Sequence, residues 1–587
     1  MKLRSWIGIG LLLGAIAATL LAPNTYYLYT LGMIAITTMV AVGLNILVGL
    51  SGQISIGHAG FFAIGAYAAS LLMLKVDWSF PAAAGVGILA TAGMGAALGA
   101  PALRVTGPYL AMVTIAFGII VERVLIEWVG LTGGFGGLSN IPKPVLFGLQ
   151  PALKDVVLIA VVLAFVAILS FDQLKQHPWG KAFQAVRDNE TAAISLGLNP
   201  LTVRVMAFTV SAAFTGLGGA FFASTIGFVS PDSFTRHRSI LFLLVVILGG
   251  IGTAEGAFVG AIVLVLLPEL IKDFADYQLL VFGVLLLLTL WLAPEGVTQP
   301  LKRWFNQTSP VYPLTTPPEM PALITRNQTA AALKVNQVGI QFGGVRAVNE
   351  VSLTVQPGMV TAVIGPNGAG KTTLLNLIGG FYQTQTGSIM LGNIDLTQQS
   401  GLAIARSGVA RTFQATRLFD SLSVIDNLRV AAKGDQTGSI FSALVGRGKA
   451  PTHPEKVLLE VLSFVGFRGD VYQTAANLPF VDRRLAEIAR ALVLGPQLLL
   501  LDEPAAGLSK DDKHMLARLV RRIASSGIPV ILIEHDMDLV MDISDQVVVL
   551  DSGDLICTGS PTQVQQDPAV LARSEERRVG KECRSRW

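Results

Sequence analysis

Long apolar runs follow one another through the first half of the chain, and they constrain its fold more than any other feature. Each run is close to the roughly 20 residues that an α-helix needs to cross about 30 Å of hydrocarbon. The runs cover approximately residues 7–22, 28–49, 54–74, 82–103, 107–129, 155–171, 205–228, 239–271 and 278–293. Only 14% of the 587 residues are charged, against about 25% in an average soluble domain. The series therefore predicts an all-α polytopic membrane domain.

The number of spans depends on the run 239–271, which is too long for one simple helix. Its glycine-rich middle, Gly249–Gly256, can divide it into two. Lys2 and Arg4 precede the first run and predict a cytoplasmic N-terminus. These residues also resemble the start of a signal peptide, but the spans that follow directly favour an uncleaved first helix. Residues 1–300 are thus predicted to hold roughly 8–10 transmembrane helices.

One interior stretch, Gly49–Gly60, is rich in glycine and small polar residues. It is either an interrupted helix that exposes backbone groups to a solute or a place where helices pack closely through small residues. A similar stretch at residues 130–137 lies between spans, and there we favour loop and packing. His58 alone is expected to be a packed histidine rather than a ligand.

A glycine-rich turn in the second half of the chain follows the apolar run Val360–Ile364, which predicts a strand, and precedes a predicted helix. The turn and the start of that helix comprise Gly365, Pro366, Asn367, Gly368, Ala369, Gly370, Lys371, Thr372 and Thr373. This is the pattern of a P-loop, whose backbone N–H groups and helix N-terminus cradle phosphates. Lys371 is expected to reach the β- and γ-phosphates, and the Thr372 hydroxyl to bind Mg²⁺. The stretch predicts an ATP or GTP site.

A second strand, Leu498–Leu501, is a continuous apolar run that ends in Asp502 and Glu503. Together with a P-loop, this pattern predicts that Asp502 holds Mg²⁺, directly or through water. Glu503 is expected to orient or deprotonate the attacking water. The alternative is a strand whose end is capped by acids.

The predicted domains are separated by a tether, residues 301–332, that contains Pro310, Pro313, Pro317, Pro318 and Pro321. From Leu333 short β-rich runs alternate with helical stretches, which predicts an α/β P-loop domain over residues 333–572. Residues 573–587 break from this pattern and are interpreted as a non-native or disordered tail. The cysteines, Cys557 and Cys583, predict no disulfide framework.

The longest polar connection between spans, residues 172–204, is rich in basic residues, which places it in the cytoplasm. Within it, Lys181–Gly197 has helical spacing. Its apolar residues can form one face: Phe183, Val186, Ala193 and Leu196. We expect a short helix that docks on the ATPase domain, and an amphipathic helix at the membrane interface is the alternative.

Several further motifs carry a resemblance to a known family. In the second half they are Gln341-Phe342-Gly343-Gly344-Val345, Arg411-Thr412-Phe413-Gln414, Ile533-Glu534-His535-Asp536-Met537 and Val547–Gly553; in the first half they are Gly43–Gln53, Tyr109–Thr114, Asn189–Ala193 and Pro231–Phe234. Residues 333–572 resemble the ATPase of branched-chain amino-acid ABC transporters, and residues 30–295 resemble their permease. The resemblance implies that Phe342 stacks on adenine. It also implies that Gln414 links the nucleotide's metal to the membrane domain and that His535 contacts the γ-phosphate.

The resemblance implies a fused permease and ATPase that uses ATP and Mg²⁺ to import branched-chain or other hydrophobic amino acids. Its expected partners are a periplasmic or surface binding protein, a second permease and a second ABC ATPase, in a bacterial cell (inner) membrane with the ATPase in the cytoplasm. Nothing in the sequence points to a nucleic-acid partner. Urea, short amides or another small solute are alternative substrates. An ABC exporter or a weakly hydrolysing regulatory ATPase is a more distant alternative.

One stretch departs from the family pattern. Where ABC ATPases carry a Leu-Ser-Gly-Gly-Gln-like signature, this chain has Leu478-Pro479-Phe480-Val481-Asp482-Arg483-Arg484, followed by a predicted helix at Glu487–Leu492. Pro479 has no N–H, and Val481 resists the close backbone approach that a phosphate needs. We expect this half-site to be weakened or inactive, and a mixed dimer with a second ATPase to have one strong and one degenerate site.

Overall fold

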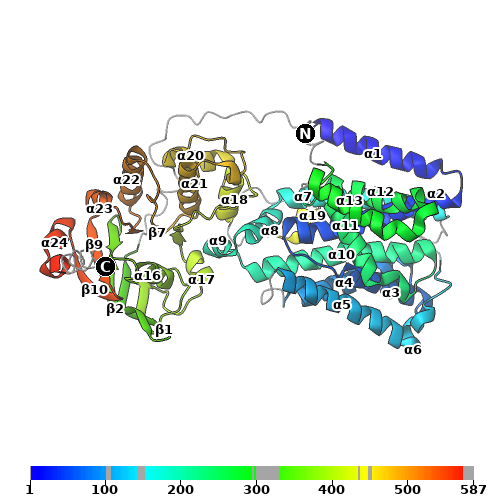
Figure 1. The fold of residues 1–587 in the computed structure, drawn as a ribbon, viewed down its shortest axis with the longest axis horizontal. Helices are drawn as coiled ribbons and strands as arrows, with labels where there is room; N and C mark the ends of the chain where they lie inside the picture. Colours follow the sequence, from blue (N-terminus) through cyan, green and yellow to red (C-terminus); the bar gives the residue numbers. More distant parts are fainter. Residues whose placement is uncertain are drawn as a thin grey trace, which may run out of the picture. The chain divides into compact units, whose positions relative to one another are not determined.

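The computed structural model in Figure 1 describes residues 2–100, 107–142, 152–293, 296–298, 321, 331–433, 437–446 and 453–572. The chain forms two compact units. The first comprises Met1–Arg187, Pro200–Thr308 and Gly438–Gly448, and the second comprises Asp188–Asn199, Ser309–Thr437 and Lys449–Trp587. The predicted tail at 573–587 and nearly all of the predicted tether at 301–332 lie outside the described residues.

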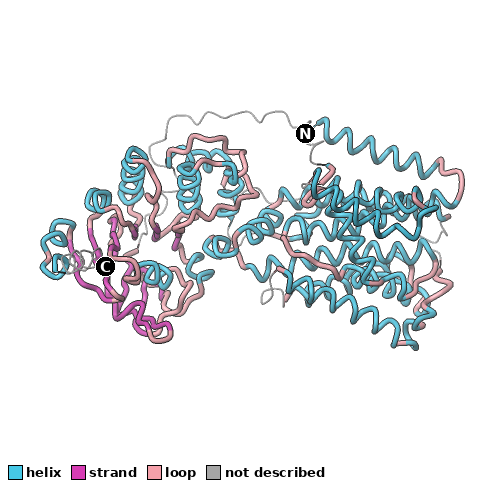
Figure 2. Tube along the Cα trace, viewed as in Figure 1, coloured by secondary structure: helices cyan, strands magenta, loops and turns pink. Residues whose placement is uncertain are grey.

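The first unit is helical (Figure 2). Its longer helices are α1 (Lys2–Leu20), α2 (Thr25–Asn45), α3 (His58–Lys75), α4 (Phe80–Gly99), α5 (Pro108–Glu127), α7 (Leu153–Gln176), α8 (Pro178–Asp188), α10 (Pro200–Ile226), α11 (Arg236–Gly249), α12 (Ala254–Leu270) and α13 (Gln278–Leu292). Among the described residues, 6 helical segments are long and apolar enough to cross a membrane, and Leu280–Leu292 is a shorter apolar helix. The predicted break in the run 239–271 is confirmed, because α11 ends at Gly249 and α12 begins at Ala254.

Helix α10 packs against α2, α3 and α4 through small residues. A Cβ atom on Gly65 of α3 would lie 2.4 Å from the carbonyl oxygen of Gly216 of α10, so only glycine permits this approach. Close packing of this kind replaces the hydrophobic driving force that helices lack inside a membrane.

The stretch Gly49–Gly60 is both interrupted and closely packed. A π-helical turn, Ile46–Leu50, ends α2, and residues 51–57 are not helical before α3 begins at His58. The His58 ring is fully buried and hydrogen-bonds to the hydroxyls of Ser55 (2.9 Å) and Ser211 (2.8 Å), which confirms a packed histidine. The stretch 130–137 is less irregular than predicted: it contains the end of α6 (Val129–Thr132) and a 3₁₀ turn, Gly134–Gly136.

The second unit contains two sheets. The 4-stranded sheet has the order β2-β1-β4-β5, and the 6-stranded sheet has the order β10-β9-β3-β8-β7-β6. The strands are β1 (Leu333–Phe342), β2 (Val345–Val355), β3 (Val360–Ile364), β4 (Thr386–Leu391), β5 (Ile394–Asp395), β6 (Val409–Arg411), β7 (Leu498–Asp502), β8 (Val530–Ile533), β9 (Gln546–Asp551) and β10 (Asp554–Gly559). Strands β6, β7, β8, β3 and β9 pair in parallel, as predicted for an α/β P-loop domain.

The second unit also contains helices, most of which lie between these strands in the sequence. They are α9 (Glu190–Ser195), α16 (Lys371–Ile378), α17 (Gly401–Arg406), α18 (Val424–Lys433), α20 (Glu455–Val465), α21 (Phe480–Val493), α22 (Lys510–Ser525), α23 (Met537–Ile543) and α24 (Pro561–Gln566). One segment of this half of the sequence, α19 (Ile440–Leu444), instead lies in the first unit. There the indole N–H of Trp179 donates to the carbonyl of Gly438 at 2.8 Å.

Two predicted helices differ from the observed ones. The helix predicted at Glu487–Leu492 begins at Phe480, directly after Pro479, because proline suits the entry to a helix. The single helix expected within Lys181–Gly197 is two helices, α8 and α9. They separate at Asn189, whose extended backbone and side chain cap the start of α9.

Candidate nucleotide site

The predicted P-loop joins β3 to α16. Gly365, Gly368 and Gly370 adopt φ values of 152°, 84° and 97°, which favour glycine. At Gly370 a Cβ atom would also lie 2.3 Å from the carbonyl oxygen of Ala347 on β2. The loop therefore takes a backbone path that brings N–H groups to the N-terminus of α16, where an anion is favoured.

Lys371 opens α16 and is buried. Its ammonium group donates to the carbonyl oxygens of Gly365 and Pro366, each at 2.8 Å, so the side chain lies over the loop. Burial lowers the pKa of Lys371, and the carboxylates of Glu503 and Asp502 oppose that change. A cation close to these carboxylates and to a phosphate-binding backbone suits the binding of a polyphosphate.

Asp502 ends β7 with 2% of its side chain exposed. One carboxylate oxygen, Oδ2, pairs with the Arg411 guanidinium at 3.0 Å. The other, Oδ1, is buried and has no hydrogen-bond partner within the described residues. Burial raises the pKa of Asp502, and Arg411 opposes this rise. A buried oxygen without a donor suits a hard cation, so these residues fit the predicted Mg²⁺.

Glu503 lies at the centre of a polar cluster. Its Oε2 accepts a hydrogen bond from Gln414 Nε2 at 3.0 Å, and its Oε1 lies 3.0 Å from His535 Nε2. Glu503 has φ 46°, a left-handed conformation that is costly for a residue with a side chain. The structure thus brings together Gln414, Glu503 and His535, although they are far apart in the sequence. A carboxylate held by an amide and an imidazole can orient a water molecule or accept its proton.

Phe342 lies at the end of β1, with 45% of the residue exposed. Its ring makes an edge contact with Tyr382, the centroids being 5.1 Å apart. An exposed aromatic ring can stack on a nucleobase. The sequence gives no signal for Tyr382, because only the folded chain places the two rings together.

A buried arginine links this cluster to α21. Arg484 donates to the carbonyl oxygens of Phe413 (2.8 Å) and Gln414 (2.9 Å). Its Nη2 also lies 3.5 Å from the backbone carbonyl oxygen of Glu503. Its own side chain is only 2% exposed. The one sign of this role in the sequence is a basic residue on a predicted helix with many apolar neighbours.

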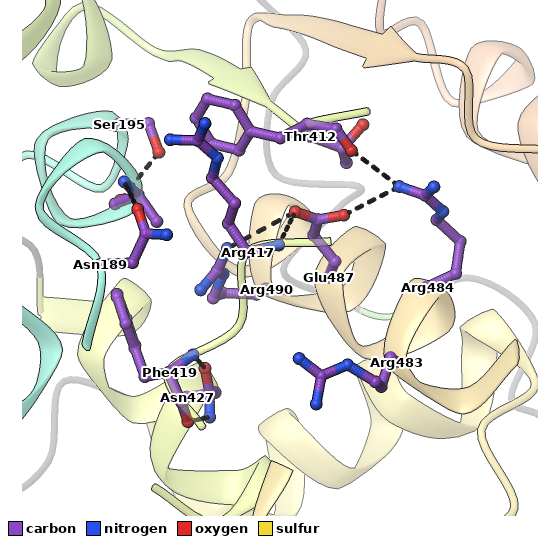
Figure 3. Close-up of polar contacts among 12 residues, drawn as sticks. Asn189, Ser195, Thr412, Arg417, Phe419, Asn427, Arg483, Arg484, Glu487 and Arg490 are labelled. Atoms are coloured by element: carbon purple, nitrogen blue, oxygen red, sulfur yellow. Dashed lines mark hydrogen bonds and ion pairs between the residues drawn. The ribbon is translucent and has the colours of Figure 1, made fainter. Parts of the chain in front are cut away.

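Glu487 lies between Arg417, Arg490 and Arg484 in Figure 3. Its carboxylate accepts from the Arg417 backbone N–H at 3.0 Å and from Arg484 Nη1 at 3.2 Å, and Arg490 Nη2 lies 3.9 Å away. Burial raises the pKa of Glu487, and its arginine neighbours oppose that rise. Side chains of one helix, α21, therefore hydrogen-bond to the backbone at both ends of the segment 413–417.

The stretch predicted to dock on an ATPase domain, Lys181–Gly197, is divided: its residues from Asp188 onward belong to a segment, 188–199, that packs in the second unit. Asp188 Oδ2 accepts hydrogen bonds from the backbone N–H (2.8 Å) and the hydroxyl (2.6 Å) of Ser421. Arg406 of α17 donates to the carbonyl of Gly197 at 3.3 Å. The Asn189 side chain accepts from Ala192 N–H at 2.9 Å and fixes α9, which Figure 3 shows beside the cluster. Phe183, Val186, Ala193 and Leu196 are all buried, but the first two lie on α8 in the first unit and the last two lie in the second unit, so they do not form the single apolar face that was predicted.

The stretch that departs from the family signature forms the start of α21. Pro479 is the N-cap of this helix and makes no side-chain cap, and Phe480 is 49% exposed at the helix N-terminus. Asp482 and Arg483 follow in the first turn, where Arg483 pairs with Asp420 at 2.7 Å. A proline and an exposed phenylalanine therefore occupy the start of α21, where the family pattern has serine and glycine.

Comparisons with known proteins agree with both halves of this description. A family model described as branched-chain amino acid transport system / permease component matches residues 26–290, and one described as ABC transporter matches residues 348–506. The permease LivM of Escherichia coli K12 is 38% identical over 302 residues, covering 47% of this chain and 71% of LivM. The ATP-binding protein LivG of the same strain is 39% identical over 243 residues, covering 41% of this chain and 95% of LivG.

The ATP-binding protein BraF of Pseudomonas aeruginosa is likewise 39% identical over 244 residues, covering 41% of this chain and 95% of BraF. The helical first unit thus matches a permease and the second unit an ABC ATPase. The chain belongs to the branched-chain amino-acid ABC transporter family and carries a permease and an ATP-hydrolysing subunit on one polypeptide.

Proposed function

We propose that this protein is the fused permease and ATPase of an importer for branched-chain and other hydrophobic amino acids. It works in a bacterial cell (inner) membrane with its ATPase unit in the cytoplasm. The observation that carries the proposal is the hydrogen-bonded cluster of Gln414, Glu503 and His535 in an ATPase that shares its chain with a permease. The contact of Asp188 with Ser421 supports coupling between turnover and transport.

In this proposal ATP binds along the P-loop with its adenine on Phe342. The phosphates lie against Gly365, Pro366, Asn367, Gly368, Ala369, Gly370, Lys371, Thr372 and Thr373. Bound Mg²⁺ would neutralise phosphate charge, held by Thr372, Gln414 and Asp502. Glu503 orients the attacking water or takes its proton, and His535 supports Glu503 and contacts the γ-phosphate.

The proposed assembly contains three companions: a periplasmic or surface binding protein, a second permease and a second ABC ATPase. The altered start of α21 supports a mixed ATPase dimer. Pro479 offers no N–H to a phosphate, and the exposed Phe480 stands where the pattern has glycine. We propose that the partner's signature completes the site on this chain's P-loop, whereas the site completed by this chain's α21 is degenerate.

Uptake in proteoliposomes tests the function. The complete assembly is expected to accumulate labelled leucine only with ATP and binding protein. Glu503→Gln should lower turnover and uptake roughly 10²–10⁴-fold, the usual contribution of a general base. The matched control is Glu460→Gln, a half-buried glutamate on α20. Uptake of urea or short amides in place of leucine would favour the alternative substrates, and uptake unaffected by Glu503→Gln would contradict the proposal.

ATP hydrolysis by the purified protein, alone and mixed with the second ATPase, tests the asymmetric dimer. The rate of ATP hydrolysis should be low for this protein alone and should rise when the second ATPase is added. Robust turnover by this protein alone would contradict a degenerate half-site.

A further inference from the structure

Arg238 is a half-buried cation of the helical first unit. It lies in the first turn of α11, and its guanidinium carbon is 4.8 Å from the ring centroid of Phe222, 5.3 Å from that of Phe62 and 5.9 Å from that of Phe242. These three phenylalanines are buried. An ionisable group facing the interior of a membrane bundle is expensive, and such groups mark solute pathways or pair with a counter-charge.

The described residues supply no such counter-charge. The hydrogen bond that Arg238 makes there goes from Nη1 to the carbonyl oxygen of Ser233, at 3.0 Å. Asp232, the nearest acidic residue in the sequence, is exposed and forms no ion pair with Arg238 in the described part of the chain. A guanidinium has several N–H donors in a planar fork, so one carbonyl and three ring faces leave donors for another acceptor.

A second group points to a ligand at the same aromatic cluster. Tyr67 of α3 is 3% exposed, and its hydroxyl has no hydrogen-bond partner within the described residues. The centroid of its ring lies 5.8 Å from the ring centroid of Phe234. The Phe234 centroid lies in turn 5.6 Å from that of Phe62 and 5.9 Å from that of Phe222. Arg238 and Tyr67 thus border one cluster of aromatic rings. Buried hydroxyls are nearly always bonded, so this one calls for a partner.

We propose that Arg238 and Tyr67 form a carboxylate-binding site on the solute path of the permease. The guanidinium fork matches a carboxylate in two parallel hydrogen bonds, and the tyrosine hydroxyl can add a third donor. The phenylalanine rings offer an apolar surface for an aliphatic side chain. The class of ligand is therefore a small carboxylate with an apolar side chain. Its identification with the transported amino acid rests on the function proposed above.

Uptake kinetics of the complete assembly provide the first test. Arg238→Gln is expected to raise the KM for leucine at least tenfold, Arg238→Lys less, and Tyr67→Phe a few-fold. Arg236→Gln, an exposed arginine in the same turn, should leave KM unchanged. Basal ATP hydrolysis and thermal stability report that each variant is folded. An unchanged KM in folded Arg238→Gln would overturn the site while leaving the proposed function intact.

Thermal stabilisation of the purified protein separates the two proposals. The probes are isovalerate, which has the carboxylate and side chain without the amine, and isoamylamine, which has the amine without the carboxylate. Isovalerate should stabilise the wild type and Arg236→Gln but not Arg238→Gln, and isoamylamine should stabilise none of them. If the assembly transports no amino acid but this pattern appears, the proposed function fails and the site stands. Stabilisation that does not depend on Arg238, or none by isovalerate, would overturn the site.

Discussion

Replacing Arg484 by methionine is expected to destabilise the ATPase unit and to slow ATP hydrolysis without preventing nucleotide binding. Methionine keeps the length of the side chain and its contact with apolar neighbours. It removes the guanidinium that donates to the carbonyls of Phe413 and Gln414 and to the carboxylate of Glu487. These groups are then left in a buried environment without their charged donor.

The size of the expected loss of stability follows from the burial of the Arg484 and Glu487 side chains. The side chains of Arg484 and Glu487 are 2% and 0% exposed, so solvent cannot replace the lost donor. Breaking a buried charge pair costs about 3–5 kcal/mol, and a hydrogen bond to a charged group contributes about 1.5–3 kcal/mol. For a unit of this size, roughly 2–4 °C of Tm corresponds to 1 kcal/mol, so the Tm should fall by about 6–20 °C.

The matched control is Arg483→Met, one position earlier on α21. Arg483 is 21% exposed and pairs with Asp420, which is 57% exposed. A surface pair of this kind contributes about 0–1 kcal/mol, and its hydrogen bond to the Ala475 carbonyl adds about 1 kcal/mol. The control should therefore lose much less stability than Arg484→Met.

Scanning calorimetry of the purified full-length protein measures the effect. The transition of the ATPase unit is the one that ADP raises, since a ligand of the native state stabilises it. Arg484→Met should keep this ADP-dependent rise, because the P-loop is untouched. Its hydrolysis rate should fall about 10–100-fold, since Gln414 is no longer held against Glu503. Equal Tm values for the two variants would refute the reasoning.

Three further changes test other contacts. Gly370→Ala should abolish the ADP-dependent rise in Tm, because its Cβ atom would meet the Ala347 carbonyl, whereas Gly344→Ala, which has open space, should not. Asp188→Asn weakens the acceptor of the two Ser421 hydrogen bonds, so in proteoliposomes uptake should fall several-fold more than ATP hydrolysis; an equal fall in both would contradict a coupling role. Burial, with Asp567 nearby, raises the pKa of Cys557, so its thiolate fraction at a given pH is reduced. In a Cys583→Ser background, maleimide labelling should rise at a higher pH than for a free thiol of pKa about 8.5, and Asp567→Asn should move the curve down.

Local patterns explain which parts of the fold could be predicted. The strands Val360–Ile364 and Leu498–Asp502 are short apolar runs bounded by a glycine-rich turn and by acids, and they are β3 and β7. The membrane helices follow from the lengths of apolar runs. The run predicted to start at residue 54 forms a helix only from His58, because residues 51–57 pack without helical hydrogen bonds. Hydropathy does not distinguish a partly buried non-helical stretch from the first turns of a helix.

Long-range partners explain what could not be predicted. The side chain of Asp188 meets Ser421, 233 positions away, and only the folded chain joins them. Tyr382 meets Phe342 for the same reason. Arg484, Glu487 and Arg490 recur at intervals of three, which places them along one side of a helix. That spacing was a usable sign of a buried charged cluster, but it did not identify the carbonyls of Phe413 and Gln414 as partners.

Residues 413–421 are held at both ends and in the middle by side chains of α21 and of the segment 188–199. At one end Arg484 holds the carbonyls of Phe413 and Gln414. In the middle Glu487 holds the N–H of Arg417, and at the other end Asp188 holds Ser421. Because the Gln414 side chain bonds Glu503, we propose that a movement of the segment 188–199 would reach the carboxylate proposed to activate water.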